Sequence, residues 1–260
     1  MSMIYEPSGK AREYSQLALN LYLGCSHGCK YCYAPNCLKK APEDYFKSPE
    51  PRKNVIKNLV KQLDREVPKE QVLLSFIGDV YCETTDGNAL TREVLEVLNY
   101  YKAPVAILTK GGKRCLADLD AFRAFGEHIQ VGTTLTFDND ADSLEWEPGA
   151  ALPAERLEVL HTLHDAGVKT FASFEPVIRP AQSLELMRRG LEFIDVYKVG
   201  KINNYKGIDK TINWPEFLTS AVDLLRGAGK AFYIKHDLRV AAPMVRLYGN
   251  EVLQDEHNVR

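Results

Sequence analysis

The chain has 260 residues, of which 45% are hydrophobic and 26% charged, and its formal net charge is −2 at pH 7. These values are typical of a globular protein of one large domain, spanning residues 1–260, and they provide no overall attraction to nucleic acid, which would need a local basic patch. No apolar run approaches the roughly 20 residues that a membrane helix needs, so we expect a soluble, cytoplasmic protein with no membrane partner.

Short apolar runs alternate along the chain with stretches in which apolar residues recur at helical spacing. Residues 1–16 are polar and turn-rich and lead into the first strand. Strands are expected at 17–23, 72–77, 105–109, 129–137, 169–174, 194–199 and 231–235. Helices are expected between them, at 51–66, 91–101, 117–125, 154–166, 180–190 and 215–227. The helix that begins at residue 154 is expected to end at Gly167, because glycine favours helix C-termini.

Strands that alternate with helices predict parallel pairing through right-handed crossovers. The sequence therefore predicts an α/β fold in which a parallel sheet, flanked by helices, closes fully or partly into a barrel. Residues 1–16 would form an N-terminal lead-in, and residues 231–260 a C-terminal extension that closes the barrel. Active sites of such barrels collect at the C-terminal ends of the strands, so the residues that follow each strand are the candidates for function.

Three of the six cysteines fall within eight residues at the end of the first predicted strand: Cys25, Cys29 and Cys32. Thiolates suit iron–sulfur clusters, zinc or copper(I), and three of them can hold three corners of a [4Fe–4S] cube, which leaves one iron open. A structural zinc site would need a fourth ligand, which His27 could supply, and Cys37 is the next cysteine. A disulfide is not expected, because the chain starts without a secretory signal and cytosolic cysteines stay reduced.

The C-x-x-x-C-x-x-C spacing, with Tyr31 before the last cysteine, resembles the signature of the radical S-adenosylmethionine (SAM) superfamily. The resemblance implies a [4Fe–4S] cluster on Cys25, Cys29 and Cys32, whose open iron chelates the amino and carboxylate groups of SAM. An electron from the cluster would cleave SAM to methionine and a 5′-deoxyadenosyl radical that abstracts hydrogen from a substrate. The six strand–helix units match the partial TIM-type (β/α)6 barrel of this superfamily. A reductant such as a flavodoxin or ferredoxin is also implied.

Within the superfamily, the motifs look most like those of the spore photoproduct lyase-like group. The resembling segments are 31–33, 79–81, 108–110, 133–136, 147–149 with Arg156, and 175–178. They imply a lyase, isomerase or modification reaction on a nucleobase, nucleoside or nucleic acid. A peptide or small metabolite is the alternative substrate, although the chain has no cysteine-rich C-terminal extension for further clusters. A non-catalytic zinc or iron–sulfur binding protein is the alternative of another class.

The same resemblance implies roles for residues near SAM. Tyr31 would lie against the adenine, and Tyr33 would relay the radical or close the pocket, although both aromatics could instead be spent on packing. Gly78 and Asp79 would hold the SAM ammonium, although Gly78 could simply turn the chain. Lys110 would meet the methionine carboxylate as a point charge, the alternative being a solvated lysine.

Three further positions lie at later strand ends. Thr134 and Thr136 would offer hydroxyls to the ribose or carboxylate, and only one of them can face the site. Glu175 would be a contact for SAM or substrate, or half of an ion pair, because a carboxylate in an apolar setting is costly unless paired. Cationic and polar residues near the last two strands would form either a basic rim over the barrel mouth or scattered surface charge. These are Lys198, Lys201, Asn203, Lys235, His236 and Arg239.

The other cysteines have different expectations. In the true lyases a cysteine just after the second strand returns a hydrogen atom to the product radical, but Ser75 or Phe76 occupies that neighbourhood here. Cys82, on the same loop, is the candidate substitute, and this departure argues against photoproduct repair itself. Cys115 and Cys37 are expected to be small buried hydrophobes, with a weak claim for Cys37 as a metal ligand.

Overall fold

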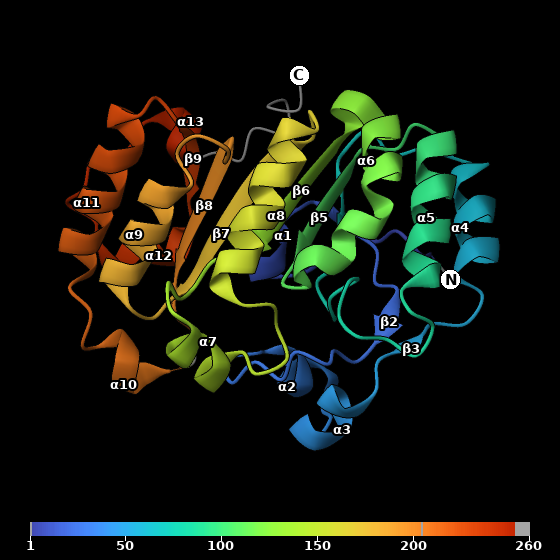
Figure 1. The fold of residues 1–260 in the computed structure, drawn as a ribbon, viewed down its shortest axis with the longest axis horizontal. Coiled ribbons are helices and arrows are strands. Elements are labelled where there is room, and N and C mark those ends of the chain that lie inside the picture. Colours follow the sequence, from blue (N-terminus) through green and yellow to red (C-terminus); the bar gives the residue numbers. More distant parts are fainter. Residues whose placement is uncertain (1, 204, 253–260) are drawn as a thin grey trace.

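A seven-stranded, fully parallel sheet forms the centre of the computed structural model, which describes residues 2–203 and 205–252 (Figure 1). Its strands are β1 Leu17–Ala18, β4 Val72–Leu74, β5 Val105–Thr109, β6 Ile129–Thr134, β7 Lys169–Val177, β8 Val196–Lys201 and β9 Ala231–Ile234. They pair in chain order, and the sheet curves into a half-barrel. The predicted partial (β/α)6 barrel of parallel strands with flanking helices is confirmed.

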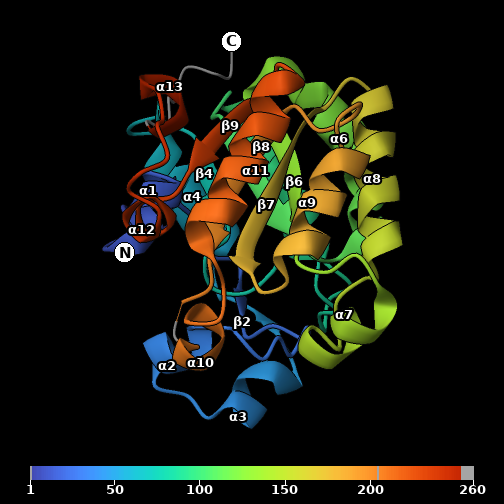
Figure 2. The same ribbon diagram turned by 90° about the vertical axis from the view of Figure 1, so that its left-hand side faces the viewer.

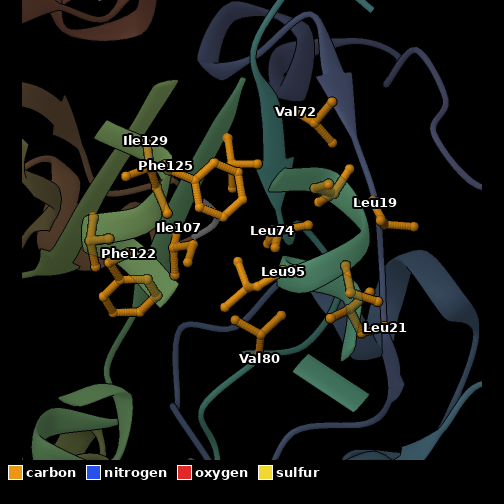
Figure 3. Close-up of a cluster of buried hydrophobic side chains, with 14 of the residues drawn as sticks. Leu19, Leu21, Val72, Leu74, Val80, Leu95, Ile107, Phe122, Phe125 and Ile129 are labelled. Atoms are coloured by element: carbon orange, nitrogen blue, oxygen red, sulfur yellow. The ribbon is translucent and has the colours of Figure 1, made fainter. Parts of the chain in front are cut away.

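Helices cover the outer face of this half-barrel (Figures 1 and 2). They are α4 Val55–Leu63, α5 Ala89–Tyr100, α6 Leu119–Phe125, α8 Pro153–Asp165, α9 Pro180–Arg189 and α11 Trp214–Gly227. Their apolar faces pack on the outward side chains of the strands, as Leu95 and Phe122 do against Leu74 and Ile107 (Figure 3). Two short 3₁₀ segments, Gly112–Asp118 and Gly126–His128, precede and follow α6.

The single strand predicted at 17–23 is wrong. The segment divides into β1 and a second strand, β2 Tyr22–Leu23, which pairs antiparallel with β3 Glu50–Pro51. The buried Asn20 explains the break, because its Oδ1 accepts hydrogen bonds from the backbone N–H groups of Phe76 and Ile77 at 3.1 and 3.0 Å. The side chain therefore replaces the backbone ladder at this point and ties the chain to the loop after β4.

Short helices that the sequence did not reveal cover the C-terminal ends of the strands (Figure 1). They are α2 Ala34–Leu38, α3 Pro42–Lys47, α7 Asp140–Trp146 and α10 Lys206–Asp209. The strands predicted to end at residues 77 and 137 stop at Leu74 and Thr134, and the chain continues into loops under these helices. A layer of short helices and loops therefore covers the strand ends.

The N-terminal lead-in connects the two edges of the sheet. Helix α1 Lys10–Tyr14 directly precedes β1, and Glu13 accepts hydrogen bonds from the Tyr233 hydroxyl of β9, at 2.7 Å, and from the backbone of His236. His236 begins α12 His236–Ala241, and α13 Gly249–Val252 follows. No helix in the described part of the chain is both long and apolar enough to cross a membrane.

Candidate functional site

A cavity of about 520 Å³ lies at the C-terminal ends of the strands, under the loop that carries the first three cysteines. Most of the predicted site residues line it. They are Cys25, Cys29, Tyr31, Cys32, Tyr33, Gly78, Asp79, Lys110, Thr134 and Glu175. Thr136 and Cys82 are not among the lining residues. Ten of the twelve residues predicted from their positions near strand ends therefore line one cavity.

The cysteine loop is pressed against the loop after β4. Gly24 has φ +104°, and a Cβ there would lie 2.7 Å from the carbonyl oxygen of Tyr45. Gly78 has φ +84°, and its Cβ would lie 2.6 Å from the carbonyl oxygen of Gly24. Only glycine tolerates both the positive φ and such an approach of two backbones. Gly78 therefore turns the chain and also lines the cavity.

His27 and Asp79 form a buried side-chain contact between the same two loops. His27 Nε2 lies 2.8 Å from Asp79 Oδ2, and its Nδ1 lies 2.9 Å from the carbonyl oxygen of Gly149. Both ring nitrogens are thus engaged within the protein. The idea that His27 completes a zinc site is contradicted, because a zinc ligand needs a free ring nitrogen.

The Asp79 carboxylate receives three further hydrogen bonds, from Tyr81 N at 2.8 Å, Thr109 Oγ1 at 2.7 Å and Lys110 N at 2.6 Å. Burial alone would raise the pKa of Asp79, but His27 and these donors outweigh it and hold the pKa below its usual value. A carboxylate has about four lone-pair positions, and four donors already fill them. This geometry makes Asp79 an anchor that orders the cavity wall.

Behind Tyr31 lies a buried ion pair that the sequence reasoning left without a role. Arg156 Nη2 and Glu147 Oε2 are 2.6 Å apart, with side chains 1% and 0% exposed. The Tyr31 hydroxyl donates to Glu147, and Arg156 also donates to the carbonyl oxygens of Ala151 and Thr134. Both residues belong to motif segments of the sequence, but their contact depends on the tertiary fold.

The two threonines of β6 and its following loop separate clearly. Thr134 lines the cavity, whereas Thr136 is fully buried and its hydroxyl lies 3.4 Å from Glu147 Oε1.

Lys110 points into the cavity, with Nζ 5.8 Å from the ring centroid of Tyr31. Burial lowers the pKa of Lys110, but the neighbouring Cys29 and Glu147 outweigh this effect and raise it, so the amine stays charged.

Glu175 lines the cavity and forms an ion pair with Lys235, whose Nζ lies 2.7 Å from Glu175 Oε2. Lys201 and Asn203 also line the cavity, so part of the predicted basic rim lies at the site. Lys201 is paired with Asp209 at 2.7 Å. Tyr33 is 43% exposed at the cavity edge, and its hydroxyl donates to the carbonyl oxygen of Phe76 at 2.7 Å.

Two predictions about the remaining cysteines are not supported. Cys82 is fully buried outside the cavity, and its thiol contacts that of Cys25. A hydrogen-atom donor must reach the cavity, so the catalytic role predicted for Cys82 has no support. Cys37 is exposed at the end of α2 and lines the cavity, so it is not a buried hydrophobe. Cys115 is buried in the core, as expected.

The chemistry of the donor set fits an iron–sulfur cluster. Cys25, Cys29 and Cys32 all reach the same cavity, and cysteine thiolates are the usual ligands of such clusters. Among the described residues, no three Cys, His, Asp or Glu side chains converge as they would on one metal ion. A [4Fe–4S] cube has no need of that convergence, because each thiolate binds a different iron.

Comparisons with known proteins give relatives of this chain in sequence and in fold. An uncharacterized protein of Methanocaldococcus jannaschii is 29% identical over 164 residues, which cover 63% of this chain and 61% of that protein. An uncharacterized protein of Acidianus two-tailed virus is 25% identical over 202 residues, which cover 73% of this chain and 65% of that protein.

Among solved structures, Streptococcus suis SuiB bound to SAM superposes with a TM-score of 0.60 at 15% identity, covering 92% of this chain and 56% of SuiB. SuiB bound to its precursor peptide SuiA gives a TM-score of 0.61 at 13% identity, covering 92% and 55%. The chain thus spans less than two thirds of the length of each of these proteins. Residues 19–194, more than half of the chain, match the sequence model of the radical SAM superfamily. The chain belongs to the radical SAM superfamily, whose members use a [4Fe–4S] cluster and SAM.

Proposed function

We propose that this protein is a radical SAM enzyme of the spore photoproduct lyase-like group, with Cys25, Cys29 and Cys32 as the cluster ligands. When bound, the cluster and SAM supply a 5′-deoxyadenosyl radical that removes a hydrogen atom from the substrate. The observation that supports this proposal most is that three thiols and the charged ends of β4, β5 and β7 line one cavity. A site built only for structure would not need an open space at these ligands.

The residues of the cavity would divide the recognition of SAM between them. Lys110 would hold the methionine carboxylate, because its charged amine points into the cavity from the end of β5. Tyr31, fixed by Glu147, would present its ring to the adenine, and Thr134 would offer a hydroxyl to the ribose. Asp79 would act as a positioning residue, since its oxygens already hold four donors, and the adjacent Gly78 backbone would approach the ammonium.

The proposal also covers the role of Tyr33 and the class of substrate. Tyr33 would close the cavity or relay the radical, because it lies at the edge with its hydroxyl held by Phe76. The motif series supports a nucleobase, nucleoside or nucleic acid as substrate. A peptide is the second candidate, and it is favoured by the likeness in fold to SuiB, which was crystallised with its precursor peptide. The net charge of −2 favours neither class.

Metal content and SAM cleavage test the chemistry together. Anaerobic reconstitution should give four irons with sulfide per chain, and dithionite with SAM should then release 5′-deoxyadenosine. Cys25→Ala, Cys29→Ala and Cys32→Ala should each lose the iron, whereas Cys37→Ala should keep it. One zinc per chain, or loss of iron in Cys37→Ala, would leave no open metal corner for SAM and would contradict the proposal.

Hydrogen transfer can identify the substrate class directly. Extract from cells grown in D₂O is separated into nucleic acid, peptide and small-molecule fractions, and each is incubated with enzyme and unlabelled SAM. The fraction that holds the substrate should transfer deuterium to 5′-deoxyadenosine, which mass spectrometry detects. Label from the peptide fraction alone would replace the nucleic-acid candidate by the peptide. Wild-type enzyme with the same fractions from cells grown in H₂O serves as the control for background label.

A further inference from the structure

Lys198 of β8 points into the half-barrel, away from the helices. Its neighbours Tyr197 and Val199 pack in the core beneath α9 and α11, and alternation along a strand places Lys198 on the opposite face. It pairs in register with Ser173 of β7, which lines the cavity. Lys198 is only 4% exposed and lies behind the cavity wall, beside the lining residues Tyr14 and Ser173.

Aromatic rings rather than carboxylates surround the Lys198 amine. Nζ lies 4.4 Å from the ring centroid of Tyr14 and 4.7 Å from that of Phe171. Within residues 2–203 and 205–252, no carboxylate lies within ion-pairing distance of it. Burial, reinforced by the charge of Lys235, lowers the pKa of Lys198 to about 7. A buried ammonium without a counter-ion is costly, so this position lowers stability unless an anion binds there.

A second amine stands beside the first. Lys235, which follows β9, lies with Nζ 5.4 Å from the centroid of the same Tyr14 ring, and it lines the cavity. It forms an ion pair with Glu175, at 2.7 Å. Gly200 leaves room for this pair, since a Cβ there would lie 2.8 Å from Glu175 Cδ and 3.0 Å from Lys235 Cδ. Of these two amines, Lys235 is paired with Glu175, whereas Lys198 has no carboxylate partner among the described residues.

We propose that Lys198 and Lys235 bind an acidic group of the substrate, a carboxylate or a phosphate. This inference rests on the proposed function, because Lys235 lines the same cavity and Lys198 packs against Tyr14, which also lines it. They come from β8 and the end of β9, whereas Lys110 and Asp79 follow β5 and β4, which lie several strands away in the sheet. The substrate would thus be an acid whose anionic oxygens lie at the β8–β9 wall, with the remainder of the molecule directed toward the SAM side.

Titration calorimetry of the cluster-loaded, SAM-bound enzyme with simple anions tests this assignment. Sulfate, phosphate and acetate are titrated at pH 7, and we expect saturable binding of at least one of them at one site per chain. Tighter binding of phosphate indicates a phosphate-bearing substrate, and tighter binding of acetate indicates a carboxylate. Lys198→Met should weaken that binding about tenfold or more, since a charge-assisted hydrogen bond is lost. Lys113→Met, at an exposed lysine paired with Glu158, should bind as the wild type does.

Thermal stability provides a second readout that separates recognition from folding. Lys198→Met should melt at a higher temperature than the wild type, because it removes a buried charge without a counter-ion. Weaker anion binding in a more stable protein cannot come from unfolding. Should the Met variant fail to fold, Lys198→Gln and Lys235→Gln carry the same binding test. Wild-type affinity in folded Lys198 variants, or no saturable binding to the wild type, would overturn the inference.

Measuring both anion binding and 5′-deoxyadenosine release by the wild type distinguishes a failure of this inference from a failure of the proposed function. Anion binding that depends on Lys198, in a protein that releases no 5′-deoxyadenosine, would support the acid site and contradict the proposed chemistry. Release of 5′-deoxyadenosine without anion binding would support the chemistry and contradict the acid site.

Discussion

The Glu147–Arg156 pair allows a sharp test of how the cavity wall is held. Glu147→Gln removes the carboxylate charge and leaves Arg156 as a buried cation whose acceptors are all neutral: the glutamine amide oxygen and the carbonyl oxygens of Ala151 and Thr134, at 2.7 and 3.0 Å. Breaking a fully buried pair in this way costs about 3–5 kcal/mol of the free energy of unfolding. For a chain of this size, about 2–4 °C per kcal/mol gives a fall in melting temperature of roughly 6–20 °C.

A matched control exists on the surface. Glu185 pairs with Arg188 at 2.7 Å, but the Arg188 and Glu185 side chains are 57% and 46% exposed. Exposed pairs of this kind contribute about 0–1 kcal/mol, so Glu185→Gln should shift the melting temperature by less than about 4 °C. Circular dichroism melts of both variants at pH 7, in one anaerobic buffer, give the comparison.

A double variant refines the test. Glu147→Gln with Arg156→Met removes both charges, so it should be more stable than Glu147→Gln alone, because no uncompensated charge stays buried. The reasoning is refuted if Glu147→Gln melts within about 4 °C of the wild type, or if the two substitutions destabilise additively. Lowering the pH should also weaken this ion pair. Arg156 and Lys110 outweigh burial and lower the pKa of Glu147, so its stabilisation is complete above about pH 4.3 and is lost as the pH falls further.

Three further predictions concern the loops around the cysteines. Gly149→Ala should reduce iron content after reconstitution, since its Cβ would collide with the Ser26 backbone, whereas Gly227→Ala, with open space around it, should not. His27→Gln should cost about 1.5–3 kcal/mol at pH 7; because Asp79 has a lowered pKa, this loss should shrink in melts below about pH 4, and an equal loss at every pH would contradict the assignment. Lys110→Met should retain iron but bind SAM about tenfold or more weakly in equilibrium dialysis, and unchanged affinity would count against its role.

The sequence predicted the parts of this protein that local pattern determines. Apolar runs such as 105–109 gave strands with correct bounds, and the position of candidates after successive strands brought ten of them to one cavity. Where a buried side chain competes with the backbone ladder, as Asn20 does, periodicity alone could not reveal the break. Helices as short as α2 and α3 have too few turns to show a period, so their place over the strand ends was invisible.

Partnerships across the fold were equally hidden. His27 is next to the cysteines in sequence, which suggested a metal ligand, but its partners lie 52 and 122 positions away at Asp79 and Gly149. Cys82 is close to Asp79 in sequence, yet its thiol contacts that of Cys25 and does not line the cavity. Sequence proximity gives a residue's loop but not the direction of its side chain, and the direction decides whether a thiol meets the substrate.

The separation of the cysteine loop from the apolar cores has a consequence for how the protein matures. Cys25, with Cys32 packed against it, belongs to a small cluster with Tyr45 and Cys82, separate from the apolar cores on which the strands and helices pack. We therefore expect the strands and helices to pack before any iron arrives, so that cluster loading is a late step confined to the loops at the strand ends. Oxidative loss of the metal should then leave a refillable polypeptide rather than an unfolded one.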